Sequence, residues 1–217
     1  MSDIARVVPK DVSSDYDLAA MTMMIYSLPR RQKKCQALVV FPGMGETWRL
    51  EQVIAAWENR VHYRAEHLLV AGTEWKIETT NIRPPIIKNL KRKPYLLRRT
   101  ANVHAQDHAH HTGEQAAWVV EMVQKLRIKT LALFVSPYHL LRAYLTLLKT
   151  FINFNIPPVK MIPVPVIISP DTIIPETGTD AWSLVQGEML RIKAYQHKGD
   201  VATLEELQQY LSFLWKE

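Results

Sequence analysis

Residues 129–151 read KTLALFVSPYHLLRAYLTLLKTF, and their apolar pattern is the strongest indication of the fold class. It opens with a continuous apolar run from Leu131 to Val135, with charge before it and proline shortly after it. Short apolar runs of this kind are typical of strands that are buried on both faces of a parallel sheet. Ser136 is a preferred helix cap and Pro137 a preferred first helical residue, and apolar residues then recur with helical spacing. The stretch therefore predicts a strand, a tight turn and the start of a helix.

Three other segments have the composition of strands. They are residues 36–41 (QALVVF), 67–71 (HLLVA) and 159–168 (VKMIPVPVII). Pro163 and Pro165 cannot donate a hydrogen bond to a neighbouring strand, so the last strand is expected to lie at an edge of the sheet or to be short.

Helices are expected between these strands and at both ends of the chain. They fall in residues 12–29, after about Thr47, after a cap at Thr112, and in residues 179–217, where Thr179 or Asp180 caps the first helix and residues 204–215 form the last. Strands that alternate with helices predict the α/β class, here a Rossmann-like three-layer α/β/α fold with a mostly parallel, doubly wound sheet. We expect one domain over residues 1–217, with its core in residues 36–168.

The composition is that of an ordinary globular protein. Its 217 residues are 47% hydrophobic and 22% charged. The net charge of +6 permits an acidic ligand, a nucleic acid or an anionic membrane as partner, and selects none of them. The single cysteine, Cys35, excludes an intramolecular disulfide and fits a reducing compartment. Neither a signal-peptide core nor an apolar run of about 18 residues is present, so we expect a cytoplasmic protein without a membrane span.

The turn after the first strand is rich in glycine. Gly43 and Gly45 allow the backbone to turn sharply and to approach a ligand, and the helix near Thr47 offers its N–H groups to an anion. The turn is not a complete dinucleotide fingerprint, because Trp48 occupies the third glycine position, and it is not a Walker loop. A plain tight turn is an equal alternative. Arg49 opposes the helix dipole in the first turn, which favours an arginine that faces a ligand or an ion-pair partner.

Polar residues also gather at the other turns. Gly72 and Thr73 follow the second strand, and His139 and Arg142 lie three residues apart on one face of the helix after Ser136. The carboxyl ends of parallel strands meet at one edge of a sheet, where open α/β proteins bind ligands. We therefore expect these residues to share one site.

Each of these side chains suits a particular task. Arg142 can hold a phosphate or carboxylate in bidentate fashion, and His139 can titrate near neutral pH as an acid or base. Glu114 is suited to orient His139 or Arg49, or to bind a ribose hydroxyl. Ser136 would be a nucleophile only with a base beside it, so capping is its expected role.

Four of these turns carry a shared pattern. Its residues are Gly43, Gly45 and Arg49 at the first turn, Gly72 and Thr73 at the second, Thr112, Glu114 and Gln115 at a helix start, and Ser136, His139, Arg142 and Ala143 at the last. Taken together they resemble the YdcF-like family, a domain of unknown function shared by YdcF, SanA and ElyC. The resemblance spans about residues 37–168 and leaves both terminal segments outside.

The resemblance implies a Rossmann-like fold with a polar pocket at the carboxyl ends of the strands. It implies nucleotide-like ligands such as S-adenosylmethionine for some members, a part in cell-envelope homeostasis for others, and no settled reaction. We therefore expect the protein to bind a small anionic ligand that is phosphorylated or nucleotide-like. If the protein is an enzyme, this ligand is its expected substrate. His139 and Glu114 are the candidate catalytic residues. The candidate ligand-binding residues are Gly43, Gly45, Arg49, Gly72, Thr73, Thr112, Gln115, Ser136 and Arg142.

Two other functions remain as alternatives. Residues 102–111 (NVHAQDHAHH) hold four histidines, His104, His108, His110 and His111, which suggest a metal-assisted hydrolase. Their spacing matches no known zinc-protease pattern, so a polar loop at the mouth of the sheet competes with this interpretation, and no metal ligand is assigned.

Residues 83–99 are strongly basic, which suggests a non-catalytic binder of nucleic acid or of an anionic surface. Only Tyr95 is aromatic there, whereas single-strand binders interleave several aromatic residues with basic ones. An irregular connection with a solvated basic face is favoured, and the binder ranks third among the three functions.

Overall fold

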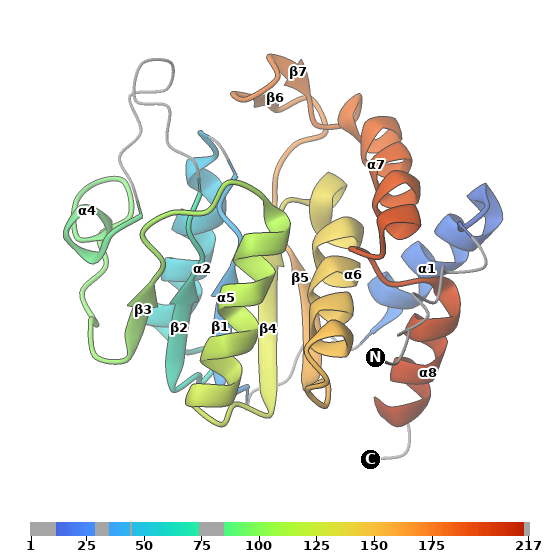
Figure 1. The fold of residues 1–217 in the computed structure, drawn as a ribbon. Coiled ribbons are helices and arrows are strands. Elements are labelled where there is room, and N and C mark those ends of the chain that lie inside the picture. The colour runs from blue at the N-terminus through green and yellow to red at the C-terminus, as the bar shows by residue number, and fades with distance from the viewer. Residues whose placement is uncertain (1–11, 29–34, 44, 74–84, 215–217) are drawn as a thin grey trace.

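The computed structural model describes residues 12–28, 35–43, 45–73 and 85–214. Within these residues, five parallel strands form one sheet in the order β3–β2–β1–β4–β5 (Figure 1). The strands are β1 (Ala37–Val40), β2 (His67–Val70), β3 (Val103–Ala105), β4 (Thr130–Val135) and β5 (Lys160–Pro165). Helices cover both faces, so the predicted Rossmann-like three-layer α/β fold is confirmed. The strand order is the one found in dinucleotide-binding folds.

The central strands are apolar because both of their faces are covered. Every residue of β1 is fully buried, and Val40 pairs with Val70 of β2 on one side and with Phe134 of β4 on the other. Strand β5 lies at the edge beside β4, as Pro163 and Pro165 predict.

One face of the sheet packs against α2 (Thr47–Asn59) and the short α4 (Ile87–Leu90). Alternate residues of the strands point to this face, and Leu38 and Phe134 share a buried cluster with Leu50 and Trp57 of α2. This alternation is the two-residue period that every strand imposes on its side chains.

The opposite face packs against α5 (Thr112–Lys125) and α6 (Pro137–Asn153). Beyond α6 lie α1 (Asp15–Ser27), α7 (Leu184–Lys198) and α8 (Leu204–Leu214) (Figure 1). Met21 of α1 and Leu207 of α8 belong to the same buried cluster as Leu133 of β4. The helices at the two ends of the described chain therefore share one core with the sheet.

Several helix boundaries follow from local sequence. Ser14 and Asp17 form a capping box at the start of α1, and Pro137 is the first residue of α6. Gly199 ends α7 in the left-handed conformation with φ of 77°, where glycine has no Cβ to strain.

Four local expectations are corrected. Residues 102–111, expected to be a loop, contain β3, and residues 83–99 contain α4. Thr179 and Asp180 do not cap α7, because they form β7 (Thr179–Asp180) and pair with β6 (Ile173–Ile174) in an antiparallel hairpin. Thr112 is the first residue of α5 rather than its cap, which is His111. Pro29, Arg83, Pro84 and Trp215, on which other boundaries rested, lie outside the described residues.

The topology creates a crevice between β1 and β4. The helix that follows β1, α2, covers one face of the sheet, and the helix that follows β4, α6, covers the other. The chain therefore turns away in opposite directions at two neighbouring strand ends, the place where open α/β sheets bind ligands. In Figure 1 the β6–β7 hairpin lies at this same end of the molecule, near the top of the view.

Candidate functional site

A cavity of about 240 Å³ lies at the carboxyl ends of β1 and β4. Its walls come from the turn after β1, the starts of α2, α5 and α6, the β6–β7 hairpin and α7. We call it the switch-point cavity. The predicted residues that line it are Gly43, Arg49, Thr73, Thr112, Gln115, His139 and Arg142. These residues follow different strands in the sequence, and the fold brings them together at one edge of the sheet.

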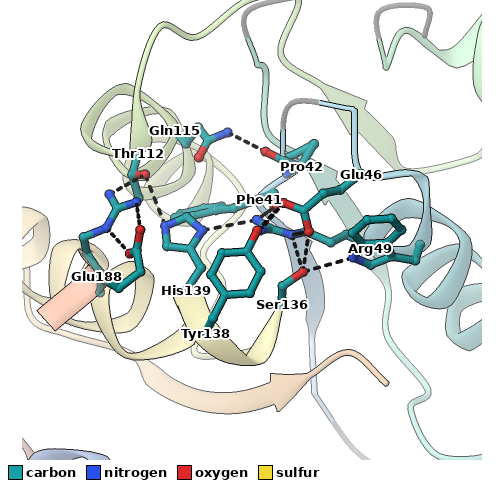
Figure 2. Close-up of polar contacts among 12 residues, drawn as sticks. Phe41, Pro42, Glu46, Arg49, Thr112, Gln115, Ser136, Tyr138, His139 and Glu188 are labelled. Carbon is teal, nitrogen blue, oxygen red and sulfur yellow. Dashed lines mark hydrogen bonds and ion pairs between the residues drawn. The ribbon is translucent and has the colours of Figure 1, made fainter. Parts of the chain in front are cut away.

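Arg49 and Glu46 form a buried ion pair at one side of this cavity. Their side chains are 2% and 1% exposed. Arg49 Nη2 donates to Glu46 Oε1 at 2.5 Å, and Arg49 Nε donates to Glu46 Oε2 at 2.9 Å, so the contact is bidentate. Figure 2 shows the two groups side by side at the centre of a hydrogen-bond network.

All five N–H groups of Arg49 are occupied by the protein. Besides the bonds to Glu46, Nη1 donates to the Phe41 carbonyl at 3.0 Å and contacts His139 Nδ1 at 3.2 Å, and Nη2 donates to the Tyr138 hydroxyl at 3.0 Å. A ligand would have to displace one of these bonds. In this structure Arg49 therefore links the start of α2 to the start of α6.

Ser136 belongs to the same network. Its hydroxyl donates to Glu46 Oε2 at 2.5 Å and accepts from Arg49 Nε at 2.8 Å and from Trp48 Nε1 at 3.1 Å. Although Ser136 occupies the N-cap position of α6, its side chain makes no capping bond. The side chain therefore does not form the predicted cap bond, and it is fully buried and absent from the cavity wall.

Tyr138 joins this network to the cavity wall. Its hydroxyl donates to Glu46 Oε1 at 2.7 Å, and burial raises the pKa of the phenol above its ordinary range. Glu46 thus accepts hydrogen bonds from three different side chains. Because every donor is satisfied by the same carboxylate, removal of Glu46 would leave several buried polar groups without a partner.

His139 is held as a neutral imidazole. Burial lowers its pKa well below the ordinary 6.5, and the guanidinium groups of Arg142, Arg49 and Arg191 lower it further. Arginine can only donate, so Nδ1 must accept from Arg49 and the ring proton lies on Nε2. Nε2 then donates to Thr112 Oγ1 at 3.4 Å. The prediction that His139 titrates near neutral pH is therefore wrong, because burial and three cations oppose its protonation.

Arg142 lies on the opposite wall, and part of its guanidinium faces the cavity. Nε donates to Glu188 Oε2 at 2.5 Å, Nη2 donates to Glu188 Oε1 at 3.3 Å, and Nη1 donates to Thr112 Oγ1 at 3.1 Å. These bonds use three of its five N–H groups. The other two have no partner among the residues that the structure describes, and the side chain is 15% exposed.

The charges around the cavity nearly balance. Arg142 shares the Glu188 carboxylate with Arg191, whose Nη1 donates to Oε1 at 2.7 Å. Two cations and one anion therefore stand on that wall. Glu176, on the hairpin, also lines the cavity. Burial of its carboxyl raises the pKa of Glu176, as does Glu46, whereas the surrounding arginines lower it.

The packing and backbone conformation of the chain itself account for the predicted glycines. A Cβ on Gly43 would lie 1.9 Å from Glu46 Oε1, and a Cβ on Gly72 would lie 2.5 Å from the His108 carbonyl carbon. Gly45 has φ of 82°, which favours glycine, and it does not line the cavity. Each position is thus glycine because another part of the chain lies against it or because the turn requires it.

Gln115 ties two turns together from inside. Its Nε2 donates to the Pro42 carbonyl at 3.3 Å (Figure 2). The same atom donates to the Gly72 carbonyl at 2.6 Å, and the side chain is buried. Thr73, also buried, contributes directly to the cavity wall. The two turns after β1 and β2 are therefore fixed relative to α5 by one amide.

Glu114 lies away from His139 and Arg49. Its Oε2 accepts from the His110 N–H at 2.7 Å, and its side chain is 42% exposed. The His110 N–H lowers the pKa of this carboxyl, with smaller contributions from the charges of nearby histidines. The expectation that Glu114 orients either residue is wrong, because the first turn of α5 directs it outward to the loop before that helix.

The histidines of residues 104–111 do not converge. His104 lies beside His67, with ring centroids 5.5 Å apart, whereas His108 and His110 contact each other and His111 Nδ1 accepts from the Glu114 N–H. Among the described residues no three His, Cys, Asp or Glu side chains form a group that could hold a metal ion. The described residues therefore offer no metal-binding site for a metal-assisted hydrolase.

The described part of the basic run, residues 85–99, is attached to α2. Arg99 Nη1 donates to the Trp57 carbonyl at 2.6 Å, and its guanidinium lies 4.2 Å from the Trp57 ring centroid. Five of its cations are exposed, namely Lys88, Lys91, Arg92, Lys93 and Arg98. The run thus has one anchored arginine and a solvated face.

Sequence reasoning missed Glu46, Tyr138, Glu188, Arg191 and Glu176. Two ion pairs among these residues are indicated by the sequence. Glu46 with Arg49, and Glu188 with Arg191, are spaced i, i+3 on a helix or at its start. That spacing predicts pairing but does not show that α7, far along the chain, returns to the cavity.

Comparison with protein-family models and with curated proteins finds no match. In the portion of the chain that the structure describes, every helix is too short or too polar to cross a membrane.

We expect the free energy of unfolding to fall as the pH drops below about 6.5, because His139 is protonated readily only in the unfolded chain. A group whose pKa is lower in the folded state favours folding fully above its unfolded pKa and loses that contribution as the pH falls. One proton contributes at most about 1.4 kcal/mol per pH unit. Urea unfolding at pH 7, 6 and 5 should show a flatter dependence in His139→Gln, and equal slopes would contradict the neutral imidazole.

Proposed function

We propose that the switch-point cavity binds a small anionic ligand, phosphorylated or nucleotide-like, and that the chain is a YdcF-like protein of the cytoplasm. The observation that carries the proposal is Arg142. Its guanidinium is fixed by Glu188 and Thr112, yet two N–H groups have no partner among the described residues and the side chain lines the cavity. A preorganised arginine with free donors is suited to bidentate binding of phosphate or carboxylate.

Three further features support an anion at this position. Arg142 and Arg191 share a single carboxylate, so their wall keeps one excess positive charge. Burial disfavours the charged form of Glu176, the third glutamate at the cavity. Helices α5 and α6 both begin at the cavity, and the N-terminal end of a helix attracts negative charge.

The contacts of His139 and Glu114, the two candidate catalytic residues, do not favour a catalytic role for either. His139 is neutral and both of its ring nitrogens are engaged, and Glu114 is directed outward. The titratable or charged residues that line the cavity from the hairpin and α7 are Glu176, Glu188, Arg191 and Tyr195. S-adenosylmethionine or another nucleotide remains a candidate cofactor through the family resemblance.

Arg142→Met should abolish or greatly weaken binding of whichever anion stabilises the wild type. A thermal-shift panel of inorganic phosphate, sugar phosphates, nucleotides and S-adenosylmethionine identifies that anion. A ligand at 100 times its Kd stabilises the folded state by about 2.7 kcal/mol. Hydrogen bonds to a charged group contribute about 1.5–3 kcal/mol, so the Kd should rise by about one to two orders of magnitude.

Lys149→Met is the matched control. Lys149 lies on the same helix, is 11% exposed and pairs with Glu206, so its removal also breaks a partly buried ion pair. We expect this variant to keep the wild-type Kd. Equal Kd values for Arg142→Met and the wild type, or no anion that shifts the wild type, would refute the proposed site.

A further inference from the structure

A second cavity of about 570 Å³ adjoins the switch-point cavity along α6. The two cavities share four wall residues, His111, Thr112, Arg142 and Tyr195. From Arg142 the second cavity continues past Thr146 and Thr150 toward the end of the helix. We call it the α6 cavity. Arg142 therefore stands at the junction of two spaces, and a ligand held by this arginine can extend into the second.

The hydroxyl of Thr146 faces the α6 cavity and has no hydrogen-bond partner among the described residues. Thr150 Oγ1 donates to the Thr146 carbonyl at 2.8 Å, the usual way in which a helical threonine satisfies its own hydroxyl. Thr146 is only 5% exposed and lines the cavity, yet its hydroxyl makes no hydrogen bond to any residue that the structure describes. Because Thr146 Oγ1 is not one of the fully buried unpaired atoms, it is open to the cavity, where it is available to a ligand or to water.

The charge of the α6 cavity differs from that of the switch-point cavity. Of the described residues that line it, Arg142 at the junction is the one arginine or lysine, whereas Glu114 and Asp200 contribute carboxylates. A second phosphoryl group would meet these carboxylates and no further cation. A neutral group with hydroxyls can donate to Asp200 and exchange hydrogen bonds with Thr146.

We propose that the α6 cavity is a subsite for the sugar of a phosphorylated sugar, either free or as part of a nucleotide. The proposal rests on the proposed function, because the phosphoryl group would bind Arg142. Residues four apart on a helix are separated by about 6 Å along its axis, so Arg142 and Thr146 are spaced as a phosphoryl group and its sugar ring require. The substrate class is thereby narrowed to sugar monophosphates.

Isothermal titrations with inorganic phosphate, ribose 5-phosphate and adenosine monophosphate test the subsite. We expect either sugar phosphate to bind the wild type at least tenfold more tightly than inorganic phosphate. Thr146→Val keeps the shape of the side chain and removes the free hydroxyl. It should raise the Kd of the sugar phosphates about three- to tenfold and leave the Kd of inorganic phosphate unchanged. Thr22→Val is the control, because the Thr22 hydroxyl donates to the Leu18 carbonyl within α1 and the residue lines neither cavity; it should change neither Kd.

Ala117→Met provides a second variant that does not depend on one hydrogen bond. Ala117 lines the α6 cavity from α5 and is partly exposed, so a longer side chain fills the cavity without entering the core. This variant should prevent binding of the sugar phosphates and leave binding of inorganic phosphate unchanged. Tighter binding of adenosine monophosphate than of ribose 5-phosphate would assign the sugar to a nucleotide, and the reverse would assign it to a free sugar.

The two proposals fail in different ways. If inorganic phosphate binds and depends on Arg142, but sugar phosphates bind no more tightly, the sugar subsite is refuted and the anion site stands. Equal effects of Thr146→Val and Thr22→Val also refute the subsite. If no phosphorylated probe binds, both proposals are refuted.

Discussion

Arg49→Met should lower the free energy of unfolding by about 3–5 kcal/mol, the usual cost of removing one partner from a buried ion pair. The variant leaves the Glu46 carboxylate 1% exposed without its bidentate partner. It also removes the donors to the Phe41 carbonyl and to His139. Globular domains are stable by about 5–15 kcal/mol, so the loss is a large part of the total.

Urea unfolding of the single and double variants measures this contribution. Glu46→Leu with Arg49→Met should be destabilised less than the sum of the two single variants, because the double variant leaves no unpaired charge. Stability is only partly recovered in the double variant, because the Tyr138 hydroxyl loses its acceptor.

Lys193→Met is the control. Its ion pair with Asp15 is exposed, and such pairs contribute at most about 1 kcal/mol. A loss of similar size in Lys193→Met and Arg49→Met would contradict the buried anchor.

The sheet was predictable because its central strands are short apolar runs with both faces covered. Strand β4 and its turn into α6 follow from the apolar run and from Pro137. Strand β3 was missed because it has three residues, of which only Val103 is buried, and lies within a histidine-rich segment that suggests a loop. The β6–β7 hairpin was missed because each of its strands has two residues, too few to show a period.

The meeting of the candidate residues at one cavity was predictable from the sequence, whereas the hydrogen-bond partners of these residues were not. Sequence places Arg49, His139 and Arg142 at the ends of parallel strands, and topology brings those ends together. Which arginine keeps free N–H groups depends on partners such as Glu188, which belongs to α7 and lies 46 residues from Arg142 in the chain. The pKa of His139 likewise depends on three arginines that only the folded chain assembles.

Gly43→Ala should be almost as harmful as the loss of Arg49, although the backbone there is not left-handed. The added Cβ would lie 1.9 Å from Glu46 Oε1 and 2.6 Å from its Cδ, so the carboxylate must move. The far end of a glutamate usually moves at little cost, but this one accepts hydrogen bonds from Arg49, Ser136 and Tyr138. Displacing it breaks the buried network, and we expect a loss of about 3 kcal/mol.

The same substitution in the Glu46→Leu, Arg49→Met background separates this cause from backbone strain. Without the carboxylate network, a Cβ on Gly43 meets only an apolar side chain that is free to adjust. We therefore expect Gly43→Ala to cost less than about 1 kcal/mol there, a coupling of the size seen for residues in direct contact. Gly72→Ala is the contrasting control, because its Cβ would meet the His108 and Ala109 backbone. Its cost should persist in both backgrounds. If Gly43→Ala lowers the free energy of unfolding equally in both backgrounds, the backbone of the turn requires glycine at this position. The contact with Glu46 would then not be the reason for the glycine.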